Sequence, residues 1–257
     1  PVWQIKKGVW AGATICSAPS TSQWFVGGAA DITSKGKLIL INSGLSEAII
    51  DVEIWSESGI RPPKVVTLKA NSSVVQPLDS LDPGAKRIAL HVAPRSGRVN
   101  AFLVDERGRG LKSLGGDMVN ASPDPTKVVV IPAIPHMKQS GKVLGHTLRV
   151  IAPGDVDARI SVELISTKGS FVPVGFDDRA IKAGIVTEIA LNPQLIPSTF
   201  ALRISSDRPI VASVYSSTYA QSKSDFVWST STAPMKEYSL AVSGLAPTLV
   251  FSGENVS

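Results

Sequence analysis

The residues that could perform chemistry are few and widely spaced. Ser34 and Lys37 fit the S-x-x-K pattern of penicillin-recognising enzymes, in which the serine starts a helix and the lysine one turn later takes its proton. Gly36 and the apolar run from Leu38 predict a strand here, and no K-T-G accompanies the pair. We therefore expect Ser34 to lie in an ordinary loop.

The histidines and the cysteine do not have the spacing of a metal site. His91 falls in the middle of an expected strand, and His136 and His146 are ten residues apart in an expected loop. A zinc site needs two ligands at short spacing and a third close by, so neither a metal nor a cofactor is predicted. Cys16 is interpreted as a small buried hydrophobic residue.

Two aspartates and three tryptophans have both a structural and a functional interpretation. Asp117 and Asp225 each precede an apolar pair at equivalent positions of an internal repeat, which favours a structural role, such as capping a turn, over a catalytic pair. Trp24, Trp55 and Trp228 could form a sugar-stacking platform. Within strands, such residues more often belong to the core or to a contact between domains.

The densest positive charge lies between Arg95 and Lys112. This segment contains five cationic side chains and two carboxylates. The formal net charge of the whole chain is +5. Arg107, Arg109 and Lys112 could bind phosphate or carboxylate oxygens of an anionic polymer, although a solvated hairpin tip is the alternative. The overall charge is too mild and dispersed to indicate nucleic acid.

The elements that must position these residues are short strands. The 21 glycines and 18 prolines interrupt the chain too often for an all-helical fold. Apolar residues alternate with period two, which is typical of half-buried strands. The clearest alternating sets are Leu38, Leu40 and Asn42; Ile50, Val52 and Ile54; and Ile88, Leu90 and Val92.

An internal repeat organises these strands. Val52-Glu53-Ile54 matches Val162-Glu163-Leu164 at an offset of 110, and the offset is 112 for Ala89 to Val92 and 113 for Lys69-Ala70. Several blocks that keep their order while the offset drifts indicate a duplicated unit. We expect an all-β fold of two tandem antiparallel β-sandwich domains of the Ig-like type.

The repeat also predicts the domain boundaries. The first sandwich is expected at residues 11–122 and the second at 123–235, with residues 13–19 matching 129–135 as the opening strands. Residues 236–257 resemble the start of a third copy. Because this tail is apolar, we expect its strands to pair with a neighbouring sheet.

Several of these blocks resemble a known family. Trp24 to Gly28, Leu38 to Gly44, Gly115 to Val119 and Val130-Ile131-Pro132 are similar to a domain-of-unknown-function family of actinobacterial envelope proteins. Members have an N-terminal membrane anchor and a β-rich extracytoplasmic part. The resemblance implies an extracytoplasmic location, secreted or anchored upstream of Pro1, and it supplies no catalytic residues.

The resulting expectation is a non-catalytic protein of the cell envelope. Its role would be scaffolding, adhesion or contact with an anionic envelope polymer or another envelope protein. The alternative is a polysaccharide-acting hydrolase with a pair of carboxylates ~5–10 Å apart in a loop cleft. No run of 18 apolar residues is present, so no membrane-spanning segment is predicted within the chain.

Overall fold

The protein is built almost entirely from antiparallel β-strands, as expected. The computed structural model describes residues 2–7, 10–195, 198–220, 223–235, 237 and 250–252, with side chains from Trp10 onward. Strands make up 64% of the structure and there is no α-helix in the described residues. In the same residues no helix has the length and apolar character needed to cross a membrane. The predicted third copy, residues 236–257, falls almost wholly outside them.

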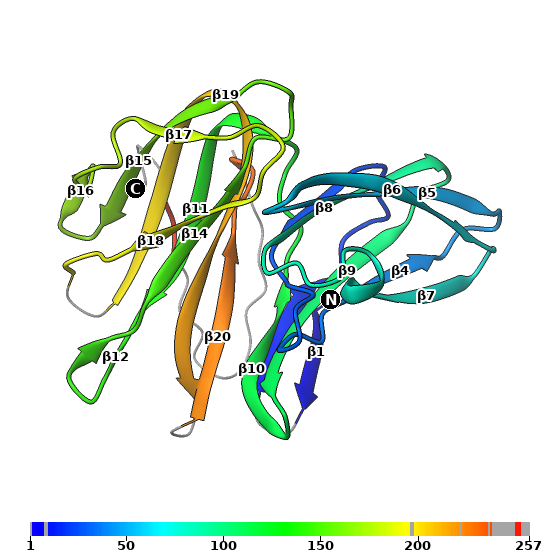
Figure 1. The fold of residues 1–257 in the computed structure, drawn as a ribbon, viewed down its shortest axis with the longest axis horizontal. Helices are drawn as coiled ribbons and strands as arrows, with labels where there is room; N and C mark the ends of the chain where they lie inside the picture. The colour runs from blue at the N-terminus through cyan, green and yellow to red at the C-terminus, as the bar shows by residue number, and fades with distance from the viewer. Residues whose placement is uncertain are drawn as a thin grey trace.

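The first unit, residues 23–119, packs two four-stranded sheets around one core (Figure 1). Leu38, Leu40, Ile50, Val52 and Ile54 all point into this core and are buried, which confirms their predicted alternation. The sheets are β3 (Gln23–Val26), β8 (Ile88–Ser96), β5 (Ala48–Ser56) and β6 (Gly59–Leu68), and β10 (Lys112–Val119), β9 (Asn100–Arg109), β4 (Lys37–Asn42) and β7 (Ser72–Pro77), with a short 3-10 helix at Leu78–Ser80.

The second unit, residues 126–230, is organised around one long strand, β19 (Ser198–Ala220). The first half of β19 pairs with β11 (Thr126–His136) and β15 (Ala158–Ser166), and its second half pairs with β14 (His146–Ile151) and β20 (Lys223–Thr230). A single strand therefore takes part in both layers around the second core. The remaining strands are β16 (Gly169–Phe171) and β17 (Arg179–Ile181) beside β15, β18 (Thr187–Leu191) beside β14, and the hairpin β12 (Lys138–Gln139) and β13 (Lys142–Val143).

The two units share strand order and register. The order β3-β8-β5-β6 corresponds to β11, the first half of β19, β15 and then β16 with β17. Val52 lies opposite Val92 just as Val162 lies opposite Ile204. These registers follow the offsets of 110 and 112 in the sequence, while the boundaries at 11–122 and 123–235 stay predictions.

The beginning of the chain differs from the expectation. The strand in the position of β11 is β3, so the match of residues 13–19 to 129–135 is wrong. Residues 10–15 instead form β2 (Trp10–Ile15), a hairpin with β1 (Val2–Lys7). Cys16 is exposed rather than buried, because it follows the end of β2 and has no sheet above it.

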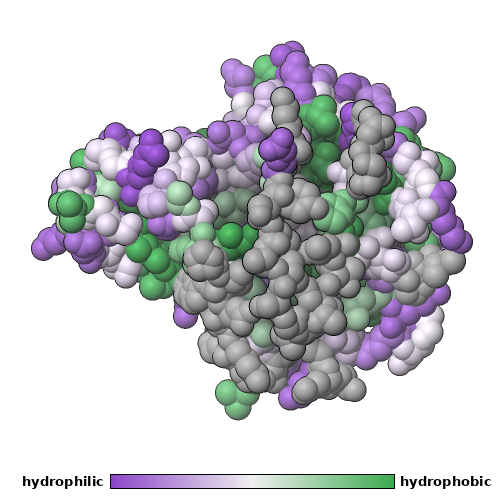
Figure 2. All heavy atoms as spheres, turned by 180° about the vertical axis from the view of Figure 1, so that it is seen from behind, coloured by the Kyte–Doolittle hydropathy of each residue, from purple (hydrophilic) through white to green (hydrophobic). Residues whose placement is uncertain are grey.

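The hairpin β1–β2 lies against the first unit. Trp10 packs with Phe102, Val104 and Met118 in a separate small core. Seen from behind, hydrophilic side chains gather along the outer rim, and hydrophobic ones reach the surface in separate patches (Figure 2).

Candidate functional site

The two units meet along a buried apolar contact. Trp24 and Trp55 from the first unit lie against Ile151 and Val211 of the second. The rings of the two tryptophans stack with centroids 5.2 Å apart. Trp228 is buried as well, so all three tryptophans are packing residues and none offers an open face to a sugar.

Edge strands of the two units face each other through aspartate side chains. Asp117 on β10 accepts a hydrogen bond from the backbone N–H of Trp228 on β20 at 2.7 Å. Asp225 on β20 accepts one from the backbone N–H of Gly116 on β10 at 3.1 Å. Both aspartates have a structural role, as predicted, but each satisfies an edge-strand donor of the other unit and does not cap a turn.

A third carboxylate lies between the units. Asp105 is 0% exposed, and it accepts hydrogen bonds from Trp228 Nε1 at 2.9 Å and from Arg107 Nη2 at 3.0 Å. The Arg107 guanidinium lies 4.9 Å above the ring of Tyr215 and 5.2 Å from that of Phe226. Arg107 is therefore held by the second unit and does not project from the hairpin tip.

We call the contact between the two units the junction. Arg149 is its largest fully buried side chain. Its Nη1 donates to the carbonyl of Gly28 at 2.6 Å and its Nη2 donates to Glu188 at 2.7 Å. The guanidinium also lies 4.8 Å above the Trp228 ring. Burial lowers the pKa of Arg149, and the nearby charge of Glu188 opposes that shift.

Burial also changes the acidity of Asp117. Removal from water raises the pKa of this carboxyl from 3.8 to about 7, and the nearby charges of Asp105 and Asp225 act in the same direction. The backbone N–H groups of Trp228 and Met118 oppose the shift. Near neutral pH the junction therefore contains a carboxyl that is easily protonated.

Two glycines of β10 allow its neighbours to approach closely, β20 at Gly115 and Trp10 of β2 at Gly116. A Cβ on Gly115 would lie 2.8 Å from the Cα of Asp225, and one on Gly116 would lie 2.5 Å from the ring of Trp10. We expect Gly115→Ala to lower the free energy of unfolding by about 2–4 kcal/mol, because it adds a clash to the strain of φ +111.

The control for that substitution is Gly110→Ala. Gly110 also has a positive φ, +59, but no atom lies within 4 Å of its added Cβ. We expect this variant to lose only about 1 kcal/mol, from backbone strain alone. Equal losses in urea unfolding of the two variants would show that the clash at Gly115 does not exist.

Arg109 and Lys112 remain at the tip of the β9–β10 hairpin. They lie opposite each other in register and flank the turn at Gly110 and Leu111. Both side chains are exposed. Of the three cations predicted to bind an anion, the structure brings these two together and separates Arg107 from them.

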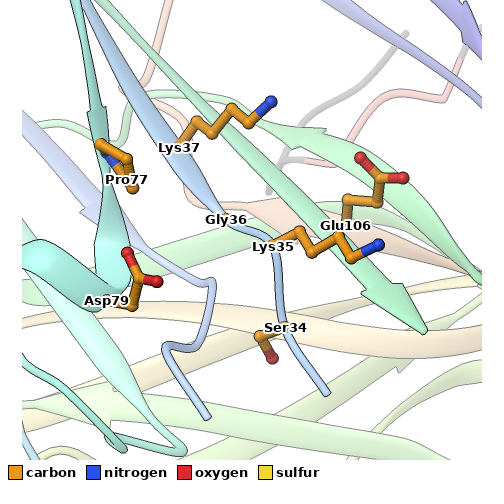
Figure 3. A pocket seen from close by; sticks show the side chains of 7 residues that line it. All are labelled: Ser34, Lys35, Gly36, Lys37, Pro77, Asp79 and Glu106. Carbon is orange, nitrogen blue, oxygen red and sulfur yellow. The ribbon is translucent and has the colours of Figure 1, made fainter. Parts of the chain in front are cut away.

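A surface pocket of about 230 Å³ contains the Ser34 motif (Figure 3). Ser34 donates its hydroxyl hydrogen to Asp31 at 3.1 Å, and Lys37 opens β4. The two side chains point in opposite directions in Figure 3. The prediction of a loop at Ser34 is confirmed, and Lys37 is not placed to take its proton. The pocket is lined by Ser34, Lys35, Gly36, Lys37, Pro77, Asp79 and Glu106.

A serine, a histidine and a glutamate form a line on the outer face of the first unit. Ser22 Oγ lies 2.9 Å from His91 Nε2, and His91 Nδ1 lies 2.7 Å from Glu53 Oε2. These contacts resemble a Ser-His-Glu triad. However, Ser22 Oγ also lies 2.5 Å from Asp124 Oδ1, and a carboxylate there would oppose the negative charge that develops on a substrate oxygen.

The row of Ser22, His91 and Glu53 is better explained as a structural contact between the first unit and the segment before β11. Glu53 and His91 are direct cross-strand neighbours, and Glu163 and Arg203 occupy the equivalent pair in the second unit. Asp124 belongs to the segment that leads into β11. Ser22 therefore ties that segment to the face of the first unit.

The other two histidines form a buried pair. They lie at the ends of β11 and β14, not in a loop as expected. His136 Nδ1 is 2.9 Å from His146 Nε2, and His146 Nδ1 is 2.8 Å from Ser216 Oγ. Burial, together with the neighbouring His136, lowers the pKa of His146 to about 4. In the part of the chain that the structure describes, no three His, Cys, Asp or Glu side chains cluster as metal ligands would.

The profile of a family of unknown function, DUF5719, matches residues 4–253. The chain belongs to this family. No curated protein matches it. Part of this DUF5719 chain is similar to a solved structure, the crystal structure of Thermotoga maritima 1070, with 16% identity and a TM-score of 0.34. That similarity covers 43% of this chain and 96% of the other.

The sequence of this DUF5719 chain predicts the roles of its junction residues only in part. Arg149 interrupts the apolar run Leu148 to Ala152, and a charge inside such a strand is a usable signal for a buried partner. Asp105 and Glu188 carry a weaker signal. Asp105 directly follows the apolar run Ala101 to Val104, as a residue at the end of a buried segment does, and Glu188 precedes Ile189 in the alternation of an ordinary half-buried strand. Their roles follow from how the two units pack.

Proposed function

We propose that this DUF5719 protein is a non-catalytic, extracytoplasmic protein of the cell envelope, with a scaffolding or adhesion role. The observation that carries this proposal is the set of hydrogen bonds that join the two units at the junction. The buried carboxyl groups Asp105 and Asp117, which have the type needed for acid–base chemistry, and the buried cation Arg149 all bind atoms of the other unit. Resemblance to anchored actinobacterial envelope proteins supports the location.

We also infer that the two units are tandem copies, 11–122 and 123–235. Equal strand order and equal registers support this inference. Two joined copies double the length of the molecule without a flexible linker, which suits a spacer or scaffold. The buried contact between them restricts relative motion.

The surface proposed to contact an anionic polymer is the β9–β10 tip with Arg109 and Lys112. Two exposed cations on a turn can reach phosphate or carboxylate oxygens without moving the sheet. Such contacts are weak and screened within about 8 Å at physiological ionic strength. Lys35 and Lys37 line the neighbouring pocket together with Asp79 and Glu106, so the pocket adds no net charge and the proposal rests on the two cations of the tip.

We expect the double variant Arg109→Ala, Lys112→Ala to keep its fold and to bind less tightly to a teichoic-acid-like or acidic polysaccharide. Loss of two exposed charges should reduce affinity about two- to tenfold at low ionic strength. The measurement is retention on the immobilised polymer, with circular dichroism to check the fold.

The matched control is Lys138→Ala, Lys142→Ala. These lysines flank the turn of another hairpin, β12–β13, and are also exposed. If the control loses retention equally, net charge alone explains binding. If the unmodified protein is not retained at all, the polymer contact is wrong.

A second candidate function is a polysaccharide-acting hydrolase. The observation that favours it is that Asp79 and Glu106 line the same pocket from different sides (Figure 3). Two carboxyl groups facing a sugar could act as acid and base. Release of reducing ends from an envelope polysaccharide, lost in Glu106→Gln, would establish this activity and overturn the non-catalytic proposal.

A further inference from the structure

A second, larger pocket opens at the edge of the second unit, beside β15 and β18. Its volume is about 450 Å³, which falls in the ~300–1,000 Å³ range of small-molecule sites. Its inner wall is formed by the core residues Val162, Leu164 and Leu202. The outer wall consists of Phe171, Val172, Pro173, Val174 and Phe176, faced by Ala190, Leu191, Asn192, Pro193 and Gln194.

The pocket lies where the edge strand of this unit is broken. In the first unit β6 runs as one strand beside β5, with a single register shift between Val52 and Ile54. In the second unit β16 ends at Phe171 and β17 begins at Arg179, so residues 172–178 form a loop beside β15. The two units thus differ at one edge of otherwise equivalent sheets.

The break removes an apolar side chain from the core. In the first unit Val66 of β6 is buried opposite Ile50. At the equivalent position of the second unit, Ile160 faces Arg179, whose side chain is exposed. Phe176 packs partly against the core, and its carbonyl accepts a hydrogen bond from the Val162 N–H at 2.8 Å. The pocket lies next to this position, beside Val162 and Leu164.

In the sequence, the broken edge strand corresponds to an insertion in the second unit. The repeat offset is 110 between Gly59 and Gly169 but 113 between Lys69 and Lys182. Three additional residues therefore lie in the segment that forms the outer wall of the pocket. An uninterrupted edge strand cannot take them up without a loop.

The lining defines the chemistry of the occupant. Among the described residues, none that lines the pocket is charged, and its polar side chains are the neutral amides of Asn192 and Gln194. A charged group would lose its hydration there without gaining a partner. We propose that the second unit binds the hydrocarbon chain of an uncharged single-chain amphiphile, whose hydroxyl or ester end bonds to these amides.

The test is displacement of a neutral apolar dye, N-phenyl-1-naphthylamine, by n-alkanols from hexanol to dodecanol. Each buried methylene should raise affinity about fourfold until the pocket is filled, after which the increase stops. Absence of dye binding, or affinities independent of chain length, would overturn the proposal. Association with phosphatidylcholine vesicles without alkanol binding would also overturn it, because it indicates a membrane surface instead.

An exposed residue at the mouth provides the first variant. Val174 lines the pocket yet is 102% exposed, so Val174→Asp should not affect folding. A carboxylate beside the hydrocarbon chain should weaken decanol binding at least tenfold. The matched control is Ile32→Asp, at a residue 101% exposed in the first unit, and equal losses in the two variants would contradict the assignment.

The repeat supplies a second, independent variant. Val162→Phe should fill the pocket, abolish alkanol binding and change Tm by no more than about 2 °C. Val52→Phe, at the equivalent position of the closed core, should lower Tm by about 5 °C or more, because it overpacks that core. If Val162→Phe lowers Tm as much as Val52→Phe, no such pocket exists.

Discussion

Arg149→Ala is expected to lower the free energy of unfolding by about 3–5 kcal/mol, because it removes one partner from a buried, hydrogen-bonded charge network. Glu188 loses its bonds to the guanidinium, and the carbonyl of Gly28 loses its donor. The second carbonyl that Arg149 reaches, on Ile88, is left without this contact too. Urea unfolding followed by tryptophan fluorescence measures the loss, since Trp228 lies directly beneath the guanidinium.

Two further variants distinguish the network from a simple loss of charge. Arg149→Lys should recover little of the stability, because one ammonium cannot reproduce the planar fork that serves Gly28 and Glu188 together. Arg159→Ala removes an arginine that is paired to Asp178 on the surface and should change stability very little. If Arg149→Ala behaves like Arg159→Ala, the junction does not stabilise the protein.

The same network predicts how the two units unfold. With Arg149 present, the units should unfold in one cooperative transition, because each buries part of the other. In Arg149→Ala, calorimetry should resolve two transitions, one for each core. A single transition in both proteins at the same temperature would contradict a stabilising role for this contact.

Asp117→Asn is expected to stabilise the protein at pH 8 and to have little effect near pH 4. The pKa of Asp117 is raised from 3.8 to about 7, so the folded protein holds a proton that the unfolded chain releases. Its contribution to stability is therefore complete below pH 3.8 and is lost as the pH rises through 7. About three pH units correspond to about 4 kcal/mol.

Asparagine preserves the geometry of this contact. Its side-chain oxygen can still accept the hydrogen bond from the Trp228 N–H, and its amide does not ionise beside Asp105. The measured quantity is the difference in unfolding free energy between Asp117→Asn and the unmodified protein across pH 4 to 8. A difference that does not change with pH would show that Asp117 is not the titrating group.

His146 opposes Asp117 over nearly the same pH range. Its pKa is lowered from 6.5 to about 4, so its contribution to stability is present above pH 6.5 and is lost as the pH falls through 4. The magnitude is about 3 kcal/mol. The two slopes largely cancel in the unmodified protein, and Asp117→Asn should therefore reveal a stability that rises from pH 4 to 6.5.

Local sequence determined most of the strands of the two cores, although not the hairpin of β1 and β2. Alternation at Leu38 and Leu40, or at Ile50 and Val52, is sufficient because period two places one face of a strand in the core whatever the rest of the chain does. The repeat also indicated the register between strands, because equivalent blocks of the two units pair with equivalent partners. Even the break beside β15 is present in the sequence, as three additional residues between Gly169 and Lys182.

Only the tertiary structure decided the roles of the charged residues. Arg107 and Arg109 are two residues apart on one strand, yet Arg107 stacks on Tyr215 of the other unit and Arg109 stays in solvent. Asp117 bonds to a strand more than a hundred residues away. Local pattern encodes which face a side chain occupies, but the partner on that face comes from the packing of the two units, in which Phe226 and Trp228 of the second unit join the core of the first. No short-range signal specifies such a partner.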